Sequence, residues 1–520
     1  MAIEIKPNSK WKDALNLKQQ TRLLMIRQEV QGVYFDIDYA KEVWDEINAE
    51  MGELEEEVNK LLPLKNISKS KVHHPPKKQF KQDGTPSKLV KKYVEIFGGV
   101  LEESCGEWFA CFKEDDWINQ ILLPLKEPLE TQEPMTISNQ KDMKEWLQSQ
   151  GWVPTLWNFK KDKRNRKMRD ERGRLIKTSP KMQEMGKLCP NLARLRGNLA
   201  KKVVRYLSLR NRRSTLKGMS GDTGWLVNTR LLKDHRLPAG SSGITNTGRQ
   251  KHTVVANVPK AKEKVIYGIP FRKMFKPTPA PKGQPASQGY KFVGYDAAQL
   301  EARVEAHYTW KYDDGVYART ILEGRKEDGT DIHTINAGVF GVDYDIAKNG
   351  KYALTYGCTA AKLAETLGKS KREGQRLYDD FWAANPSLAQ LKDAVTRVWK
   401  MNHNTWIRNI DGGKLYSRSE HSILNLLFQA TGATIMDLAG VIMDEWVEIL
   451  NRRYPDADVR RVIYYHDEYI FEYRESMGDE FGERLGEMGC ESIREAGRRL
   501  GLAIPLDGDY KIGGSWSDVH

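Results

Sequence analysis

The segment "VIYYHDEYIFEY" (462–473) places acidic residues where an apolar strand would be expected to continue. β-branched and aromatic residues flank His466, Asp467 and Glu468 on both sides, so the simplest prediction is a strand, a tight turn and a second strand. Acids between apolar strands are costly to desolvate unless they reach water or bind a ligand. A solvated polar turn is the alternative interpretation.

Another acid follows an apolar run upstream. In "YKFVGYDAAQLEARVEAHY" (290–308), the pattern predicts a strand that ends at Asp296 and a helix from Ala297 onward. An aspartate there is most often a helix cap, but its carboxylate also projects beyond the sheet. If Asp296 and Asp467 converge, they form a hard-oxygen site for Mg²⁺, which takes one or two carboxylates and substrate phosphates. Two such ions can hold the entering and leaving oxygens of a phosphoryl transfer.

A cation and two aromatic rings share a face of a third predicted element. Lys348, Tyr352 and Tyr356 in "YDIAKNGKYALTYG" (344–357) follow each other at four-residue intervals, so a helix would place them in one stripe. This set suits a triphosphate at one end and a stacked base at the other, and His333 upstream could donate to a phosphate. Tyrosines at helical spacing more often belong to a core, so this segment alone leaves both interpretations open.

The segments that must position these residues differ in composition and in hydrophobic pattern along the chain. Residues 38–62 predict a long amphipathic helix, and 138–150 a second helix with a serine or asparagine cap. Residues 63–137, rich in Pro and Lys, predict an irregular insertion or exposed subdomain. The basic run 160–174 predicts a solvated loop, and 181–213 a basic pair of helices that would attract phosphates. No internal repeat is expected.

Composition favours a polyanionic partner. The 520-residue chain can hold several subdomains and has a net charge of +13, although a generally basic protein without nucleic acid is the alternative. Its five cysteines contain no CxxC pair, which suits a reducing compartment. A zinc site from Cys105, Cys111, His73 and His74 is conceivable, but their spacing matches no common pattern. Without a signal peptide or a stretch of about 20 apolar residues, a soluble, intracellular protein without a membrane is expected.

Together these motifs resemble those of family A DNA polymerases, most closely the replicative polymerases of bacteriophage T-seven type. The resemblance rests on "DAAQLEAR" (296–303), "KNGKYALTYG" (348–357) and "HDE" (466–468), in this order. It extends over nearly the whole chain through "IRQEVQGVYFDID" (26–38), "QSQGWVPT" (148–155), "TGR" (247–249), "GGKLYSRSEHSILNLLFQATGA" (412–433) and "GSWSDVH" near the end. One such motif is weak, whereas several in the family's order are specific.

The resemblance implies a role for each matching residue. Asp296 and Asp467, with the backbone carbonyl of Ala297, would bind two Mg²⁺ ions that activate the primer 3′-hydroxyl, and Glu468 would be an auxiliary acid. On the nucleotide, Lys348 would contact the triphosphate and the leaving pyrophosphate, and His333 would contact the β-phosphate. Tyr352 would lie near the sugar, and Glu301 would be the gate that excludes a 2′-hydroxyl. Tyr356 would stack at the templating position. DNA would contact Arg249 and Gln429 in the minor groove and Asn425 and His421 on the same stripe, with Arg303 supporting the site.

The chain departs from the family pattern in three places. Tyr344 stands where the family has an arginine, so one triphosphate contact is missing or comes from elsewhere, for instance from Lys351. The segment 250–259, after "TGR", is shorter than usual. The relatives begin with a 3′–5′ exonuclease domain, whereas this chain begins where their thumb is expected. Proofreading is therefore expected from a separate exonuclease subunit.

The resemblance implies an α/β (α+β) right-hand polymerase fold with an antiparallel palm sheet and helical fingers and thumb. The expected thumb covers 1–215, the palm 216–307 and 425–520, and the fingers 308–424. The insertion 63–137 stands where the relatives bind thioredoxin as a processivity factor, which predicts a thioredoxin-like partner. A basic loop that faces DNA is the alternative.

The expected activity is extension of a primer on a DNA template with dNTPs, releasing pyrophosphate. The protein would bind primer-template DNA as a monomer in the cytoplasm of an infected bacterial cell. A single-subunit RNA polymerase is one alternative, but that class of enzyme has other residues at the positions of Glu301 and Tyr352. An inactive DNA-binding accessory protein is another, against which the two aspartates speak.

Overall fold

The computed structural model describes residues 11–66, 73–114, 117–129, 132–184, 187–189, 191–192, 195, 197–218, 221, 223–228, 230–367 and 369–520. Two compact units divide the chain: Met1–Asp45 with Arg213–His520, and Glu46–Arg212. The N-terminal segment thus belongs to the same unit as the C-terminal half. The assignment of thumb, palm and fingers stays a prediction.

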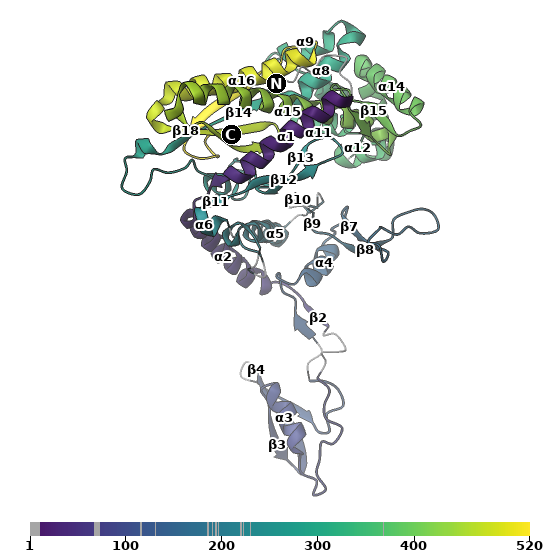
Figure 1. The fold of residues 1–520 in the computed structure, drawn as a ribbon. Helices are drawn as coiled ribbons and strands as arrows, with labels where there is room; N and C mark the ends of the chain where they lie inside the picture. The colour runs from purple at the N-terminus through teal and green to yellow at the C-terminus, as the bar shows by residue number, and fades with distance from the viewer. Residues whose placement is uncertain are drawn as a thin grey trace. The chain divides into compact units, whose positions relative to one another are not determined.

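A four-stranded antiparallel sheet holds the predicted acids in the larger unit (Figure 1). Its strands, in spatial order, are β17 (Arg460–Tyr465), β18 (Glu468–Arg474), β14 (Tyr290–Ala297) and β19 (Gly508–Gly513). The predicted hairpin is confirmed, because only His466 and Asp467 separate β17 from β18. His466 has a left-handed backbone with φ of 61°, which a β-branched residue would resist.

Helix α16 (Asp479–Leu500) packs on β14 and β19 through glycines. A Cβ atom at Gly489 would lie 2.4 Å from the ring of Tyr295. Gly482 and Gly486 meet Tyr473 and Tyr510 in the same way. Because these positions lack a side chain, the helix can approach the aromatic surface of the sheet closely.

The long helix α15 (Ile423–Arg453) runs through the core of this unit. With the preceding turn it forms Glu420–Arg453, which within the described part of the chain is the one helix long and apolar enough to cross a membrane. The prediction that no stretch comes near such a span is therefore wrong. However, 94% of its most apolar 18-residue stretch is buried. The helix packs against α1 (Trp11–Gln31), α8 (Leu300–Asp313) and α16, as a core helix does.

The residues between α8 and α15 are mostly helical. The helix predicted over 344–357 is confirmed as α11, which packs against α10. The elements of this region are α9 (Val316–Glu323), α10 (Ile332–Phe340), α11 (Tyr344–Thr355), α12 (Ala360–Leu367), α13 (Lys371–Ala384), α14 (Pro386–Met401), β15 (Trp406–Arg408) and β16 (Lys414–Tyr416). Ahead of β14 lie β1 (Val33–Tyr34), α6 (Leu231–Asp234), β11 (Arg236–Leu237), β12 (Ala239–Ile244), β13 (Gln250–Val254) and α7 (Gly268–Lys273).

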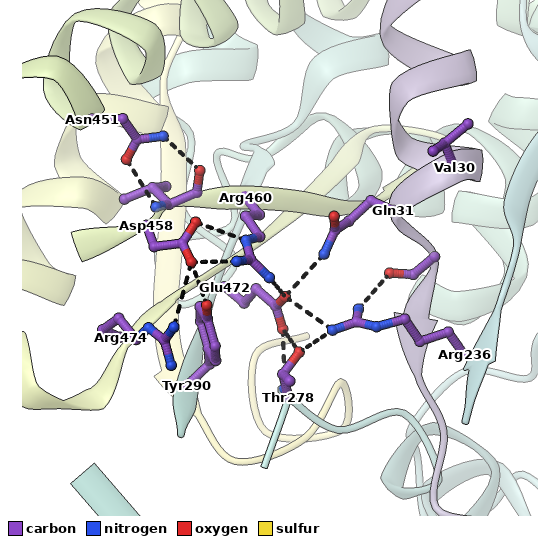
Figure 2. A network of polar contacts seen from close by, with 12 residues as sticks. Val30, Gln31, Arg236, Thr278, Tyr290, Asn451, Asp458, Arg460, Glu472 and Arg474 are labelled. Atoms are coloured by element: carbon purple, nitrogen blue, oxygen red, sulfur yellow. Dashed lines mark hydrogen bonds and ion pairs between the residues drawn. The ribbon is translucent and has the colours of Figure 1, made fainter. Parts of the chain in front are cut away.

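A buried acid ties the N-terminal segment to the sheet (Figure 2). The carboxylate of Glu472 on β18 accepts hydrogen bonds from the backbone N–H and hydroxyl of Thr278, at 3.0 and 2.7 Å. Gln31, at the end of α1, donates to it at 3.4 Å, and Arg236 lies 3.8 Å away. Because an unpaired buried charge is costly, these contacts fix α1 and β11 against the strand.

In the smaller unit two predicted helices are present and a third differs. The helix expected over 38–62 is α2 (Ile37–Asn59), which begins in the larger unit, and that over 138–150 is α4 (Gln140–Ser149), capped by the side chain of Asn139. The helical pair expected over 181–213 is wrong in its first half. Its elements are a hairpin of β9 (Gln183–Glu184) and β10 (Lys187–Leu188), followed by α5 (Asn198–Leu216); Arg194 and Arg196 of the expected stripe lie outside the described residues. Pro180 and Pro190 bracket the hairpin and oppose a helix.

The described part of the predicted insertion is a folded module. β2 (Leu64–Asn66) pairs with β6 (Gln132–Pro134) at its base. Beyond them, β3 (Val100–Ser104), β4 (Glu107–Glu114) and β5 (Trp117–Leu122) form a sheet, and with α3 (Lys88–Ile96) they enclose a small core of their own. Cys111 is buried and Cys105 exposed, and no group of three potential metal ligands occurs among the described residues, so a zinc site gains no support.

Candidate active site

The strand register places three acids in one row. Asp296 pairs with Glu468 of β18 on one side and with Asp509 of β19 on the other, and residues paired across a sheet share a face. The pKa of the Asp296 carboxyl is raised, because the surrounding protein desolvates it and Glu468 and Asp509 are like charges. Asp296 does not cap a helix, since α8 begins at Leu300 after Gln299.

Asp467 lies in the turn beside this row. Its backbone carbonyl accepts a hydrogen bond from the N–H of Ala297 at 3.2 Å, so the chain segments of the two predicted metal ligands are adjacent. The Asp467 carboxylate lies 3.5 Å from Nη2 of Arg249. Burial raises the pKa of Asp467, and the charge of Arg249 opposes this rise.

Glu301 joins residues from three other parts of the chain. Its Oε1 accepts a hydrogen bond from Gln429 on α15 and lies 3.6 Å from Arg249 in the turn between β12 and β13. Its Oε2 accepts one from the hydroxyl of Tyr356 at 2.6 Å. Glu301 thus gathers predicted DNA-binding and nucleotide-binding residues, and Arg249 extends the cluster to Asp467.

Aromatic rings continue this cluster along α10 and α11. The centroids of Tyr356 and Tyr352 are 6.1 Å apart, and those of Tyr352 and His333 are 5.7 Å apart. Lys348 lies one turn before Tyr352 and is exposed. Desolvation, with the charges of Lys351 and Lys348, lowers the pKa of His333 to about 4, so its ring is neutral at pH 7.

Lys351 is unable to replace the arginine that the family has at the position of Tyr344. Its side chain is buried and ion-paired with Glu305, which also accepts from the hydroxyl of Tyr317. The expectation was wrong because Lys351 lies on the core side of α11. The ammonium of Lys326 instead lies 4.3 Å from the ring centroid of Tyr344.

Three predicted binding residues carry buried polar atoms that lack a hydrogen-bond partner within the described residues. They are Nε of Arg249, Nδ1 of His333 and Oδ1 of Asn425. Such an atom costs about 1–3 kcal/mol while it stays unpaired, and a ligand that pairs these three atoms would remove that cost. Asn425 and Gln429 are partly exposed although most residues of α15 around them are buried, and His421, one turn before Asn425, is exposed.

Glu468, the predicted auxiliary acid, is held by residues to which the sequence pattern assigned no role. Glu468 is buried, accepts from Nε1 of Trp516 at 2.8 Å and lies 3.4 Å from Arg272, so it is no solvated turn residue. His520 lies 3.1 Å from the same carboxylate. Asp509 was also missed, because its role depends on strand register. Arg303 was expected: it donates to the carbonyls of Ala298 at 3.0 Å and Pro505 at 2.6 Å, which joins the loops beneath the acids.

The chemistry of the acids fits a divalent cation. No group of three His, Cys, Asp or Glu that could hold a metal ion occurs in the part of the chain that the structure describes. Even so, Asp296 is exposed, has like charges on both neighbouring strands and a raised pKa, and a cation would relieve this repulsion. Carboxylate and carbonyl oxygens are the ligands that Mg²⁺ prefers.

A comparison with protein families identifies the chain. The model of DNA polymerase family A matches residues 167–518, more than half of the sequence. The chain belongs to DNA polymerase family A. Within family A it is similar to the DNA-directed DNA polymerases of Enterobacteria phage T3 and Escherichia phage T7, each 29% identical over 44% of this chain and 33% of the relative. It therefore spans about a third of the length of these two relatives. The DNA-directed DNA polymerase of Escherichia phage Phieco32 is 26% identical over 59% of this chain and 61% of that relative.

The predicted fold class is confirmed. The POL domain of Pol1 from M. smegmatis, solved in complex with DNA primer-template and dNTP, superposes with a TM-score of 0.60. This match covers 98% of the chain and 73% of that structure at 16% identity, and shows a shared fold. Helices and antiparallel sheets make up both units, as expected for an α/β polymerase fold.

Proposed function

We propose that this chain is a DNA polymerase that extends a primer 3′-hydroxyl with dNTPs on a DNA template. The convergence of Arg249, Glu301, Tyr356, Gln429 and Asp467 in one polar cluster carries the proposal, because these residues come from separate segments that matched the family's motifs. Membership of family A and the phage relatives named DNA-directed DNA polymerase support it.

Asp296, Asp467 and the carbonyl of Ala297 would hold two Mg²⁺ ions. When bound, such ions stabilise negative charge on the reacting phosphate and lower the pKa of the attacking hydroxyl. Glu468, held by Trp516 and Arg272, would position the strand end that carries Asp467. Arg249 pairs with Asp467 in the structure, and would turn toward DNA when a cation balances that carboxylate.

The nucleotide would lie along α11. Lys348 would neutralise the triphosphate and protonate the leaving pyrophosphate, and His333 would donate to the β-phosphate. Lys326, above Tyr344, would supply the remaining positive charge. Tyr352 and Glu301 would bound the sugar, and Tyr356 would stack at the templating position. Asn425, His421 and Gln429 would follow the new duplex along α15.

Single-turnover primer extension tests the proposal. Asp296→Asn and Asp467→Asn each keep the side-chain shape and remove the charge, so extension with Mg²⁺ and dNTPs should fall by ~10³-fold or more. Asp479→Asn, an exposed aspartate of α16, is the matched control and should extend normally. Normal extension by either site variant would refute the assignment, and preferential use of NTPs by the wild type would favour an RNA polymerase.

The insertion module is proposed to bind a protein partner such as a thioredoxin-like processivity factor. Its support is a folded core together with exposed apolar side chains, among them Leu89, Ile96 and Ile118. A separate exonuclease subunit, a monomeric state and a cytoplasmic location in an infected bacterial cell stay proposals, which rest on the likeness to phage polymerases.

A further inference from the structure

Residues 157–180 of the smaller unit form a hairpin arm, bounded by β7 (Trp157–Phe159) and β8 (Lys177–Pro180) (Figure 1). Beyond these strands the backbone continues as a three-rung ladder. The N–H of Lys160 donates to Ile176, that of Met168 to Lys160, and that of Ile176 to Met168, at 2.8–3.1 Å. The ladder divides the arm into two lobes, 161–167 and 169–175, each closed by a bridge between its ends. The expected loop is therefore an ordered element.

The two lobes repeat one structure, contrary to the expectation of no internal repeat. "KKDKRNRK" (160–167) and "MRDERGRL" (168–175) share the pattern D-x-R-x-R. In the first lobe the carboxylate of Asp162 accepts from the N–H groups of Arg164 and Arg166 and from Nε of Arg166, at 2.8–2.9 Å. Asp170 accepts the corresponding three bonds in the second lobe, at 2.8–3.0 Å. Asn165 and Gly173, at matching positions, both have positive φ.

This framework presents a concentrated positive charge. The arm holds ten Lys and Arg against three Asp and Glu, a net charge of +7, whereas the whole chain has +13. All ten cations are exposed: Lys160, Lys161, Lys163, Arg164, Arg166, Lys167, Arg169, Arg172, Arg174 and Lys177. The two aspartates bind only Nε of the Arg166 and Arg174 side chains, and both side chains remain exposed. The side chains of five cations make no hydrogen bond or ion pair to any described residue; they belong to Lys160, Lys161, Lys163, Arg164 and Arg172.

We propose that the arm binds the sugar-phosphate backbone of duplex DNA. Ordered cations without partners are the groups that neutralise phosphates and release counterions. Between 160 and 176 the arm has no aromatic residue, so it lacks the stacking surface that binders of unpaired bases use. Trp157 and Phe159 lie at its base, where Lys177 and Lys167 cover their rings at 4.8 Å. Charge without stacking favours the duplex over a single strand.

This proposal rests on the proposed polymerase function and adds a second DNA contact to it. A binding assay without nucleotides tests the contact made by the arm separately from polymerase activity. The full chain with Lys160, Lys161, Lys163, Arg164 and Arg172 changed to Gln keeps both aspartate-centred turns. The control carries Gln at five exposed cations of the other unit: Lys233, Lys282, Lys369, Lys371 and Arg372. Anisotropy would measure affinity for a blunt duplex of ~20 bp and for one of its strands, without dNTPs, between about 50 and 200 mM salt.

Duplex affinity of the arm variant should fall by ~10-fold or more, with a log-log salt slope shallower by about 3–5, while the control changes by less than ~3-fold. Equal losses in both variants, or a loss confined to the single strand, would overturn the proposal. Unchanged melting temperatures would confirm that the variants fold. A double variant, Arg164→Gln with Arg172→Gln, changes one arginine in each lobe and should lose an intermediate amount of duplex affinity. Because the readout is binding alone, primer extension by the wild-type chain remains an independent test of polymerase activity.

Discussion

Glu301 holds three donors that lie far apart in the sequence, so a single carboxylate organises one wall of the proposed nucleotide site. Arg249, Gln429 and Tyr356 all converge on it. A carboxylate fixed at two oxygens is rigid, and a rigid wall can exclude one extra hydroxyl on a sugar.

We expect Glu301→Ala to raise the use of NTPs relative to dNTPs by ~10-fold or more, because the substitution opens the space next to the sugar. The ratio of kcat/KM values for a matched NTP and dNTP measures this. Tyr356→Phe is the control, since it removes one hydrogen bond to Glu301 and keeps the carboxylate. An unchanged ratio in Glu301→Ala would show that another residue excludes the 2′-hydroxyl.

His307 makes stability depend on pH. Its Nδ1 accepts a hydrogen bond from the N–H of Ala503 at 3.0 Å, and desolvation, with Lys311 nearby, lowers its pKa from 6.5 to about 4. As the pH falls through this interval, the unfolded chain takes up the proton before the folded one, so the free energy of unfolding decreases.

Urea unfolding at pH 7 and at pH 5 should therefore show a larger loss of stability for the wild type than for His307→Gln. Glutamine offers an acceptor to Ala503 and does not titrate in this range. Equal losses in the two proteins would place the pH dependence elsewhere, for instance at His252, whose pKa desolvation also lowers to about 4.

Individual elements show what the sequence could and could not predict. The hairpin at Asp467, helix α11 and helix α4 with its Asn139 cap follow from local periodicity and turn chemistry, and the structure has them. The row of Asp296, Glu468 and Asp509 depends on which strands pair and in which register, and local patterns do not encode that. The buried pair of Lys351 and Glu305 was missed for a similar reason, since each residue alone resembles a surface charge.

The contact between α16 and the sheet should be sensitive to one methyl group. Gly489→Ala would place Cβ 2.4 Å from the ring of buried Tyr295, so we expect a loss of about 1–3 kcal/mol in the free energy of unfolding. Gly338→Ala in α10 is a matched control, because no atom lies within 4 Å of its added Cβ and alanine favours helix. Similar unfolding curves for both variants would contradict the close packing.

At the scale of the whole molecule, the insertion module can be deleted without cutting through another element of the fold. Asn66 of β2 pairs with Gln132 of β6, so its two ends meet, and a two-residue Asn-Gly turn can replace residues 67–131. The shortened chain should fold and extend a short primer at a rate within ~3-fold of the wild type, because the cluster around Glu301 lies in the other unit.

On long templates with a trap for released enzyme, the shortened chain should make shorter products and should not respond to added thioredoxin. A full-length chain assayed without thioredoxin is the control for a partner effect. If product lengths match those of the full-length chain with and without thioredoxin, the module has no role in processivity.

The order of strands in the central sheet also bears on biosynthesis. β14 carries Asp296 and lies between β18 and β19, which a ribosome makes much later. From the synthesis of β14 until β18 and β19 are made, both edges of β14 therefore lack their neighbours, and its unpaired backbone N–H and C=O groups are open to mispairing. The nascent polypeptide is thus expected to depend on chaperones until β18 and β19 have been made, and chains truncated before β18 are expected to be inert and prone to aggregate.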